Sequence, residues 1–297
     1  MKALLIGAGG IGQNVYLPQL IKKGFIVETV DSNLPATYDN IDKVDSTYDV
    51  AVICTPNFTH YELATHIAKK NIAPVIFVEK PGFATADMWS NTVEQYRATK
   101  FIMCKNNLYR DTQGAITSYT NDATAEKMLR IDINWLNNNR VPNPGGWSTN
   151  KRLSGGGVAL DLFPHLYCQF IKMFDVEFLQ HITRSSYSMT QQWGMSDMLG
   201  SDYGTVDPNG TYDVCDFAQE TWHLNDTIIN IQAGWKSGID NQSIIVHTKD
   251  SSYQWNFGLC PAYAYGEMIM QGMLEDYDYH IEMDTWIHKQ LEVYYEG

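Results

Sequence analysis

A glycine-rich turn between an apolar run and a helical pattern constrains the fold of this chain more than any other feature. The run "KALLIG" is typical of a strand buried on both faces, and it leads into "GAGGIG". A helical pattern follows, and a second apolar run, "FIVETV", ends at Asp31. Gly7, Gly9 and Gly12 fit G-x-G-x-x-G, whose glycines permit a tight turn, a close approach to a pyrophosphate and packing of helix on strand. This order of elements predicts a dinucleotide site, with the phosphates at the helix N-terminus.

Asp31 bears on which dinucleotide binds. An acid at the tip of the second strand is placed to accept hydrogen bonds from the adenosine ribose. A 2′-phosphate would meet this carboxylate, and no arginine follows at once. We therefore predict NAD rather than NADP, with a simple turn aspartate before "SNLP" as the alternative interpretation.

Apolar runs and helical patterns go on alternating through the first part of the chain. The further strands are "YDVAVICTP", "PVIFVEKP" and "KFIMCKNN", and the helices between them are "HYELATHIAKKN" and "TADMWSNTVEQYRAT". Such alternation with short loops predicts an α/β domain with a doubly wound parallel sheet, a Rossmann domain, over residues 1–118. Residues 32–48 look too short and polar for a full crossover helix, so we expect a trimmed connection. Pro18 should kink the first helix or delay its regular part.

The second part of the chain has a different rhythm. Runs such as "EKMLRIDINWLN", "VEFLQHITRSSYS", "ETWHLNDTIINIQAGWKSG" and "QSIIVHT" alternate apolar and polar residues. This predicts an α+β domain over residues 119–297, with an open, mostly antiparallel sheet. An apolar face on "TIINIQAGW" with little helix to cover it favours a homo-oligomer, a homodimer or homotetramer. Residues 189–212 read as a long polar loop, either a lid or a surface excursion.

Composition limits the partners. A length of 297 residues, 44% of them hydrophobic, suits two domains with sizeable cores. A net charge of −13 argues against a nucleic acid or an anionic membrane as partner. The five cysteines are scattered without a CxxC, as in a cytoplasmic protein with reduced thiols. The first apolar run is too short for a signal peptide or a membrane span.

The stretch "VIFVEKPGF" ends a buried strand with an acid, a base and a helix breaker. The carboxyl ends of strands in a doubly wound sheet open onto the ligand crevice. Glu79 and Lys80 are therefore expected to leave the core beside the cofactor, and Pro81 to fix the loop that aims Lys80. A surface lysine is the alternative, and the strand-end position argues against it.

A second candidate group follows a run of three glycines in "GGGVALDLFPH". Asp161 and His165 stand at i and i+4 of a predicted helix and would share one face, although Pro164 between them makes that geometry approximate. Removing a hydride from an alcohol carbon needs a base for the hydroxyl proton and a cation for the developing alkoxide. His165 suits the base and Lys80 the cation or a proton relay, while Asp161 would orient His165 or the substrate. Which of Lys80 and His165 takes the proton stays open. The alternatives are a metal pair, for which no third ligand suggests itself, and a structural histidine.

Four motifs in order resemble the Gfo/Idh/MocA oxidoreductases. They are the opening glycines, "TPNFTH" (residues 55–60), "EKP" (79–81) and "GGGVALDLFPH" (155–165). The match covers nearly the whole chain, which is shorter than many members. Phe163 and Pro164 depart from the small and aliphatic residues usual there, which bears on the shape of the pocket.

The resemblance implies roles for further residues. The cofactor-binding set it implies, together with the glycine motif, is Gly7, Gly9, Gly10, Ile11, Gly12, Asp31, Thr55, Pro56, Asn57, His60 and Glu79. The substrate-binding set is Lys80, Asn107, Arg110, Trp147, Asp161 and His165, with Trp147 equally suited to a core. It also implies an open sheet face that is often used for self-association.

These observations predict an NAD-dependent oxidoreductase that acts on a secondary alcohol, or the matching ketone, of a sugar, polyol or sugar derivative. One alternative is a reductase of a non-sugar substrate, as in the bilin and dihydrodiol branches of the family. Another is a non-catalytic NAD-binding regulator. A regulator would be expected to lack Lys80 or His165, and both are present.

Overall fold

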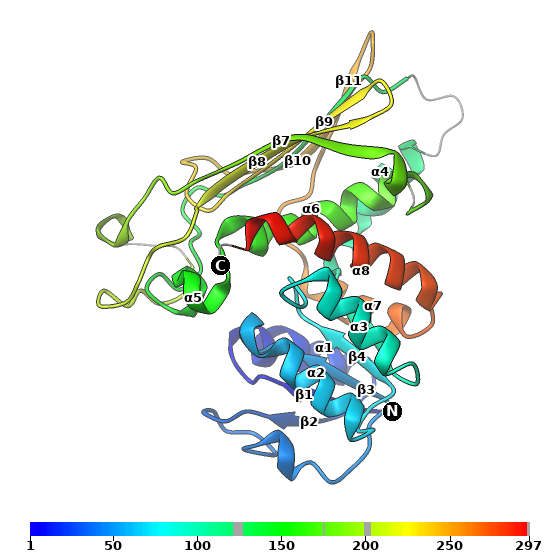
Figure 1. Cartoon of the computed structure of the whole chain (residues 1–297), viewed down its shortest axis with the longest axis vertical. Coiled ribbons are helices and arrows are strands. Elements are labelled where there is room, and N and C mark those ends of the chain that lie inside the picture. Colours follow the sequence, from blue (N-terminus) through cyan, green and yellow to red (C-terminus); the bar gives the residue numbers. More distant parts are fainter. Residues whose placement is uncertain (121–126, 175, 199–202, 296–297) are drawn as a thin grey trace. The chain divides into compact units, whose positions relative to one another are not determined.

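The structure is a computed structural model, and it describes residues 1–120, 127–174, 176–198 and 203–295. The chain forms two compact units (Figure 1). The first comprises Met1–Tyr109 and Pro261–Glu292, and the second comprises Arg110–Cys260 and Val293–Gly297.

These units differ in two ways from the predicted ranges 1–118 and 119–297. Helix α4 (Asp111–Thr120) belongs to the second unit, so the boundary lies before it rather than within it. Residues 261–292 return to the first unit and form two helices there, α7 (Ala262–Gly272) and α8 (Tyr277–Leu291).

The first unit is built on a five-stranded parallel sheet in the order β2-β1-β3-β4-β5. Its strands are β1 (Lys2–Ile6), β2 (Ile26–Val30), β3 (Val50–Ile53), β4 (Val75–Val78) and β5 (Lys100–Met103). The strand order reverses between β1 and β3. In doubly wound sheets, ligands bind outside the carboxyl ends of the strands at this switch point.

Helices flank the sheet of the first unit, and they are α1 (Leu17–Lys22), α2 (His60–Lys69), α3 (Ala86–Gln95), α7 and α8. Tyr16, Leu20, Met268 and Ile269 pack into the core of one sheet face, which joins α1 and α7. A π-helical turn over Gly12–Tyr16 precedes α1, and Pro18 lies at its first positions. The regular helix is thus delayed as predicted, because proline lacks the N–H that a helix interior requires.

The connection from β2 to β3 is short and irregular. Between these strands the only helical element is a single 3-10 turn at Ile41–Lys43, and every residue there is described. The predicted trimmed connection over residues 32–48 is confirmed.

The second unit contains a six-stranded sheet in the order β11-β10-β6-β9-β8-β7. Its strands are β6 (Arg130–Leu136), β7 (Ile182–Thr190), β8 (Phe217–Leu224), β9 (Thr227–Gly234), β10 (Asn241–His247) and β11 (Ser252–Asn256). The pair β6–β9 is parallel, and the other four pairs are antiparallel. The predicted combination of a Rossmann unit with a mostly antiparallel sheet is confirmed.

One face of this second sheet is covered by helix α6 (Val158–Phe174), which packs on β6, β8 and β9. Ile229, Ile231 and Ala233 of β9 point to this side and are fully buried. The apolar face of "TIINIQAGW" is thus covered within the unit, so the predicted exposed apolar face, on which the expectation of self-association rests, is wrong. The remaining helix is α5 (Lys151–Ser154).

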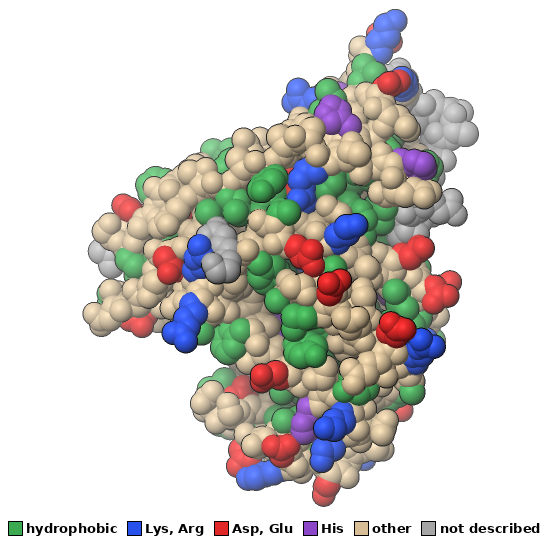
Figure 2. All heavy atoms as spheres, in the orientation of Figure 1, with side chains coloured by type: hydrophobic (Ala, Val, Ile, Leu, Met, Phe, Trp, Pro, Cys, Tyr) green, Lys and Arg blue, Asp and Glu red, His purple; other side chains and the backbone are tan. Residues whose placement is uncertain are grey.

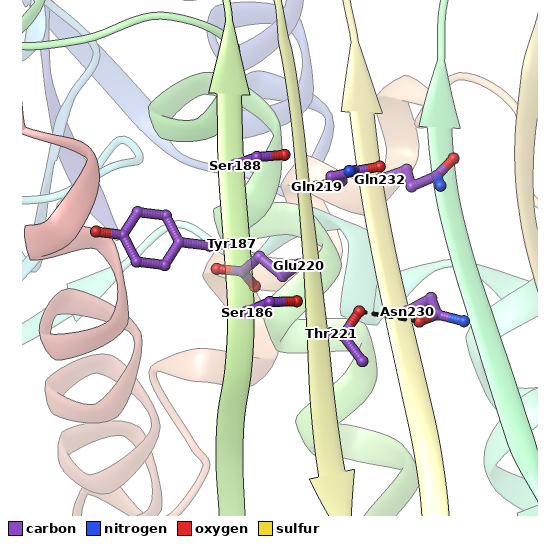
Figure 3. A pocket seen from close by; sticks show the side chains of 8 residues that line it. All are labelled: Ser186, Tyr187, Ser188, Gln219, Glu220, Thr221, Asn230 and Gln232. Carbon is purple, nitrogen blue, oxygen red and sulfur yellow. Dashed lines mark hydrogen bonds between the residues drawn. The ribbon is translucent and has the colours of Figure 1, made fainter.

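The opposite face of the sheet is mostly polar in the middle of β7, β8 and β9. A shallow pocket there includes the uncharged side chains Ser186, Ser188, Gln219, Thr221, Asn230 and Gln232 (Figure 3). The Thr221 hydroxyl and the Asn230 amide oxygen form a hydrogen bond of 3.2 Å across the two strands. This face offers hydrogen-bonding groups rather than an apolar surface.

The segment predicted as a loop over residues 189–212 begins within β7, and its residues 199–202 lie outside the described residues. Its later part packs along residues 143–145. Asn143 N donates to Tyr203 O, Asp207 N donates to Pro144 O at 2.8 Å, and Gly145 forms a bridge with Thr211.

The surface carries both signs of charge. On the face drawn in Figure 2, Lys and Arg side chains are scattered among Asp and Glu. No helix among the described residues has the length and apolarity needed to cross a membrane.

Candidate active site

The glycine turn after β1 is shaped by contacts that only glycine permits. Gly7 has φ +100°, and a Cβ there would lie 2.8 Å from the Cys54 carbonyl oxygen. A Cβ on Gly12 would overlap the Gly7 carbonyl oxygen. Around Gly9 and Gly10, in contrast, a Cβ would meet no atom within 4 Å. The turn is therefore tight on its inner side and open on its outer side.

Asp31 follows β2 and ties this strand to the glycine turn. One carboxylate oxygen accepts a hydrogen bond from Ala8 N at 2.8 Å, and the other accepts from Asn33 N and Leu34 N at 2.8 and 2.9 Å. Burial raises the pKa of Asp31, but the three backbone donors together outweigh it and lower the pKa below its ordinary value. A carboxylate thus stands beside the turn at neutral pH.

These residues fit a dinucleotide. The open side of Gly9 and Gly10 allows close approach of a pyrophosphate to the backbone. The ionised Asp31 carboxylate retains lone pairs that could accept from ribose hydroxyls. Ile11, the remaining predicted contact of this turn, precedes the π-helical turn and is half-buried.

The second candidate loop follows β3. Thr55 and Thr59 share a hydrogen bond of 2.6 Å between their hydroxyls, and the Thr59 hydroxyl donates to Pro56 O at 2.7 Å. Asn57 opens the 3-10 turn Asn57–Thr59, and His60 begins α2 directly after it. Because β1 and β3 are adjacent and parallel, this loop emerges at the same sheet edge as the glycine turn.

Glu79 closes β4 and is turned into the protein. Its carboxylate accepts from the Tyr16 hydroxyl at 2.5 Å and from Lys80 N at 3.1 Å, and only 7% of the residue is exposed. Burial, with a further contribution from Cys104 and the nearby Glu79 charge, raises the pKa of Tyr16 well above its usual value. Glu79 thus joins the end of β4 to the helical turn after the glycine loop. Direct contact of Glu79 with the cofactor stays a prediction.

Lys80 lies in a four-residue turn at the same sheet edge. Gly82 N donates to Glu79 O at 3.0 Å and closes the turn, in which the Lys80–Pro81 peptide bond is cis. Glu79 N in turn donates to Ile53 O at 2.9 Å, which anchors the turn to β3. Lys80 itself is half-buried. The turn therefore carries Lys80 out of the core at the edge where the glycine turn also ends.

Asp161 and His165 lie in the second unit on α6, which continues through Pro164. Trp235 Nε1 donates to the Asp161 carboxylate at 2.7 Å. The His165 ring stacks on Trp135 with centroids 5.4 Å apart. Each of the two predicted side chains thus contacts a tryptophan. Trp135, which contacts His165, lies in β6, and Trp235, which contacts Asp161, directly follows β9.

Arg110 supports the Trp135–His165 stack through Phe257. Its guanidinium donates to the carbonyl oxygens of Phe257 and Gly258 at 2.7 and 3.1 Å and lies over the Phe257 ring. The Phe257 and Trp135 rings lie edge to face with centroids 5.4 Å apart, and the His165 ring stacks on Trp135. Arg110, predicted to bind substrate, is 5% exposed and has a clear packing role.

The other predicted substrate residues lie in different settings. Asn107 is fully buried in the first unit, and Trp147 is 38% exposed, so Trp147 is not a core residue. Phe163, which departs from the family pattern, contacts Tyr167 and Tyr294 in the core.

Sequence reasoning missed Trp135, Trp235, His288 and the buried pair Lys105–Asp284. Trp135 could have been recognised, because it occupies a core-facing position of an alternating strand. The other residues follow a strand or lie on a weakly patterned helix, and nothing in their neighbourhood marks them.

The first unit thus has a parallel sheet, a glycine turn at its switch point and an acid after β2, the features of a nicotinamide dinucleotide-binding domain. Residues 1–105 match the sequence model of the Gfo/Idh/MocA family, described as an oxidoreductase family with an NAD-binding Rossmann fold. This match over the first unit confirms the predicted resemblance to the family and the predicted class of enzyme, an oxidoreductase.

Relatives extend over most of the chain. A protein of Amycolatopsis mediterranei (strain S699), named as a candidate UDP-kanosamine synthase oxidoreductase subunit, is 23% identical over 288 residues, which are 88% of this chain and 77% of the relative. The structure of GenD2 from gentamicin A biosynthesis, in complex with NAD, superposes with a TM-score of 0.75 at 15% identity, over 97% of this chain and 92% of that one. A variant of KijD10, a 3-ketoreductase from Actinomadura kijaniata in complex with TDP-benzene and NADP, gives a TM-score of 0.71 at 10% identity, over 99% and 96%. At these identities, the two structures show the fold.

Proposed function

We propose that this protein transfers a hydride between a nicotinamide dinucleotide and a secondary alcohol, or the matching ketone, of a sugar, polyol or sugar derivative. The observation that carries the proposal is the turn Glu79–Gly82, which brings Lys80 out at the sheet edge shared with the glycine turn. A cation at that edge is the group that an alcohol oxidation or ketone reduction needs.

The chain's residues divide the chemistry as follows. Bound NAD would supply the site that accepts or donates the hydride. Lys80 holds the developing alkoxide through its charge and can relay the proton, and His165 accepts or returns the hydroxyl proton. Asp161, oriented by Trp235, positions substrate hydroxyls or His165. Thr55, Asn57 and Glu79 line or support the cofactor.

The substrate class is supported by the relatives. The name of the Amycolatopsis relative refers to UDP-kanosamine, and that of GenD2 to gentamicin A biosynthesis. KijD10 is named as a 3-ketoreductase and is bound to TDP-benzene. We therefore propose a sugar derivative, and NAD ahead of NADP because the Asp31 carboxylate is ionised beside the glycine turn. The KijD10 complex contains NADP, so this preference needs its own measurement.

A substrate screen tests the proposal. Purified protein is mixed with NAD or NADP and with free hexoses, inositol, or UDP- and TDP-activated hexoses, and formation of the reduced nicotinamide is followed by absorbance. The matching keto compounds and a set of non-sugar ketones are tested with NADH. Turnover with at least one of these compounds supports the proposal, and NADH turnover with only non-sugar ketones would move the assignment to the non-sugar branch.

Self-association through the second sheet also stays a proposal. Its support is the resemblance together with the uncharged polar outer face around Gln219 and Gln232 (Figure 3). Light scattering at micromolar concentration should give a particle at least twice the chain mass of 33.8 kDa. A particle of the chain mass alone would contradict it.

A further inference from the structure

One peptide group, that between Gly82 and Phe83, is gripped at both ends by buried histidines. The Gly82 carbonyl oxygen lies 3.0 Å from His60 Nδ1, and Phe83 N donates to His288 Nε2 at 3.0 Å. Both histidines are 1% exposed. Gly82 is the last residue of the turn that carries Lys80, so this peptide group determines how that turn ends.

The hydrogen bonds of His288 define its state. Because Phe83 N–H donates to Nε2, the ring proton lies on Nδ1, where it donates to the Asp284 carbonyl oxygen at 2.6 Å. Burial lowers the pKa of His288 to about 4, so the ring is neutral near pH 7. A neutral ring is the form that can accept from Phe83.

The position of the His288 ring is itself fixed. It stacks on Trp89 with centroids 4.4 Å apart and planes 23° from parallel. Gly82 has φ +83°, and a Cβ there would overlap His288 Nε2, so glycine is what lets the ring come this close. The same turn of α8 is joined to β5 through Asp284, which accepts from Met103 N at 2.8 Å.

His60 joins two loops. Its Nδ1 faces the Gly82 carbonyl and its Nε2 lies 2.9 Å from the Thr55 carbonyl oxygen, so one ring spans the loops after β3 and β4. Burial lowers the pKa of His60, and the charge of Lys80 lowers it further. Both partners are carbonyls, so a neutral ring donates to one of them at a time.

We propose that His60 and His288 are positioning residues that clamp the Gly82–Phe83 peptide group and thereby fix where the turn presents Lys80. The inference rests on the proposed function of Lys80. Neither histidine needs to touch the reacting atoms. Their effect would be on the geometry of the proton and charge transfer, where displacement of a group by about 1 Å can cost about 100-fold in rate.

Paired amide substitutions test the clamp. Asparagine can place its amide near the position of a histidine Nδ1, and glutamine near that of Nε2. His288→Gln therefore keeps an acceptor for Phe83, whereas His288→Asn keeps only the contact with Asp284. The order reverses at the other histidine, where His60→Asn keeps the contact with Gly82 and His60→Gln keeps only that with Thr55.

Each variant is assayed for kcat, KM and NAD affinity with the substrate that the screen identifies. We expect kcat to be about 10- to 100-fold lower in His288→Asn than in His288→Gln, and lower by a similar factor in His60→Gln than in His60→Asn. KM and the Kd for NAD should stay within a few-fold. Melting temperatures control for folding. If the variants of one histidine do not fold, the order of kcat between the two variants of the other histidine decides whether the clamp stands.

Labelling of Lys80 gives a second readout that needs no substrate. The proteins are treated with trace acetic anhydride, and acetylation of Lys80 relative to an exposed lysine is measured by mass spectrometry. Reactivity should follow the same reversed order. The same amide ranking at both histidines, or kcat that only tracks melting temperature, would overturn the clamp. Near-normal turnover of Lys80→Ala would instead refute the function proposed for Lys80, so the two failures are distinguishable.

Discussion

Replacing Asp284 by asparagine should destabilise the first unit strongly. The Lys105 ammonium and the Asp284 carboxylate form an ion pair at 2.5 Å, with side chains 1% and 0% exposed. Lys105 Nζ also donates to Met103 O at 2.9 Å, and Asp284 accepts from Met103 N. Asparagine keeps an oxygen for Met103 N but leaves the buried ammonium without its counter-charge.

The size of the effect follows from that uncompensated charge. Removing one partner of a buried ion pair typically costs about 3–5 kcal/mol, far more than the pair is worth relative to apolar residues. The double variant Lys105→Met/Asp284→Asn removes the stranded charge as well. Its free energy of unfolding should therefore be higher than that of Asp284→Asn alone.

Urea denaturation followed by circular dichroism and tryptophan fluorescence measures these differences. The ring of Trp89, stacked on His288 of the same helix, lies in the affected region. Asp226→Asn serves as the control, because it breaks the exposed Lys127–Asp226 pair and should change nothing measurable. If Asp284→Asn is no less stable than this control, the buried ion pair does not stabilise the first unit in the way proposed.

Three further predictions follow from the first unit. Gly12→Ala should abolish NAD binding in calorimetric titration, because the added Cβ overlaps the Gly7 carbonyl oxygen, and unchanged affinity would contradict the geometry of the turn. NAD should bind more tightly than NADP, because the lowered pKa of Asp31 keeps a carboxylate where a 2′-phosphate would lie. Asp31→Ser should narrow the difference between the two affinities. Equal affinities in the native protein would refute this preference. Burial lowers the pKa of His288 from 6.5 to about 4 in the folded protein. As the pH falls below about 6.5, His288 is therefore protonated in the unfolded chain but stays neutral in the folded one. The free energy of unfolding should drop by about 1.4 kcal/mol per pH unit between about 6.5 and 4. His288→Gln should flatten that slope in denaturation curves measured across this range, and an unchanged slope would show that His288 is not the titrating group.

Much of the first unit could be predicted because its signals are local. The apolar runs of β1 and β4, the glycine turn and the delay of α1 by Pro18 each depend on neighbouring residues. Helix α8 escaped because half of its buried face is polar. His280, Asp284 and His288 lie there beside Met283, Ile287 and Leu291, so the apolar stripe is only one residue wide and marks the helix weakly.

In the second sheet, the sequence pattern predicts which side chains share a face but not what packs against that face. The alternation in β9 correctly separated Ile229 and Ile231 from Asn230 and Gln232, but it could not tell which layer covers the apolar side. That layer is α6, whose buried residues run through nearly all of its length. The clamp on Gly82 could not be predicted from the sequence, because its two histidines, His60 and His288, are far apart along the chain.

The central claim is that Lys80 acts in the chemistry and does not hold the cofactor. The most direct measurement is the turnover of Lys80→Ala beside its affinity for NAD, with His165→Ala measured in parallel. The account assigns binding of the dinucleotide to Gly7–Gly12 and Asp31, so it predicts a Kd for NAD within a few-fold of the native value. It also predicts a loss of kcat of about 10²–10⁴ in each variant. Since both groups serve one proton and one oxygen, the double variant should be little slower than the slower single. Near-normal turnover in folded Lys80→Ala protein, or a loss of NAD affinity and thermal stability that fully accounts for the lost activity, would contradict it.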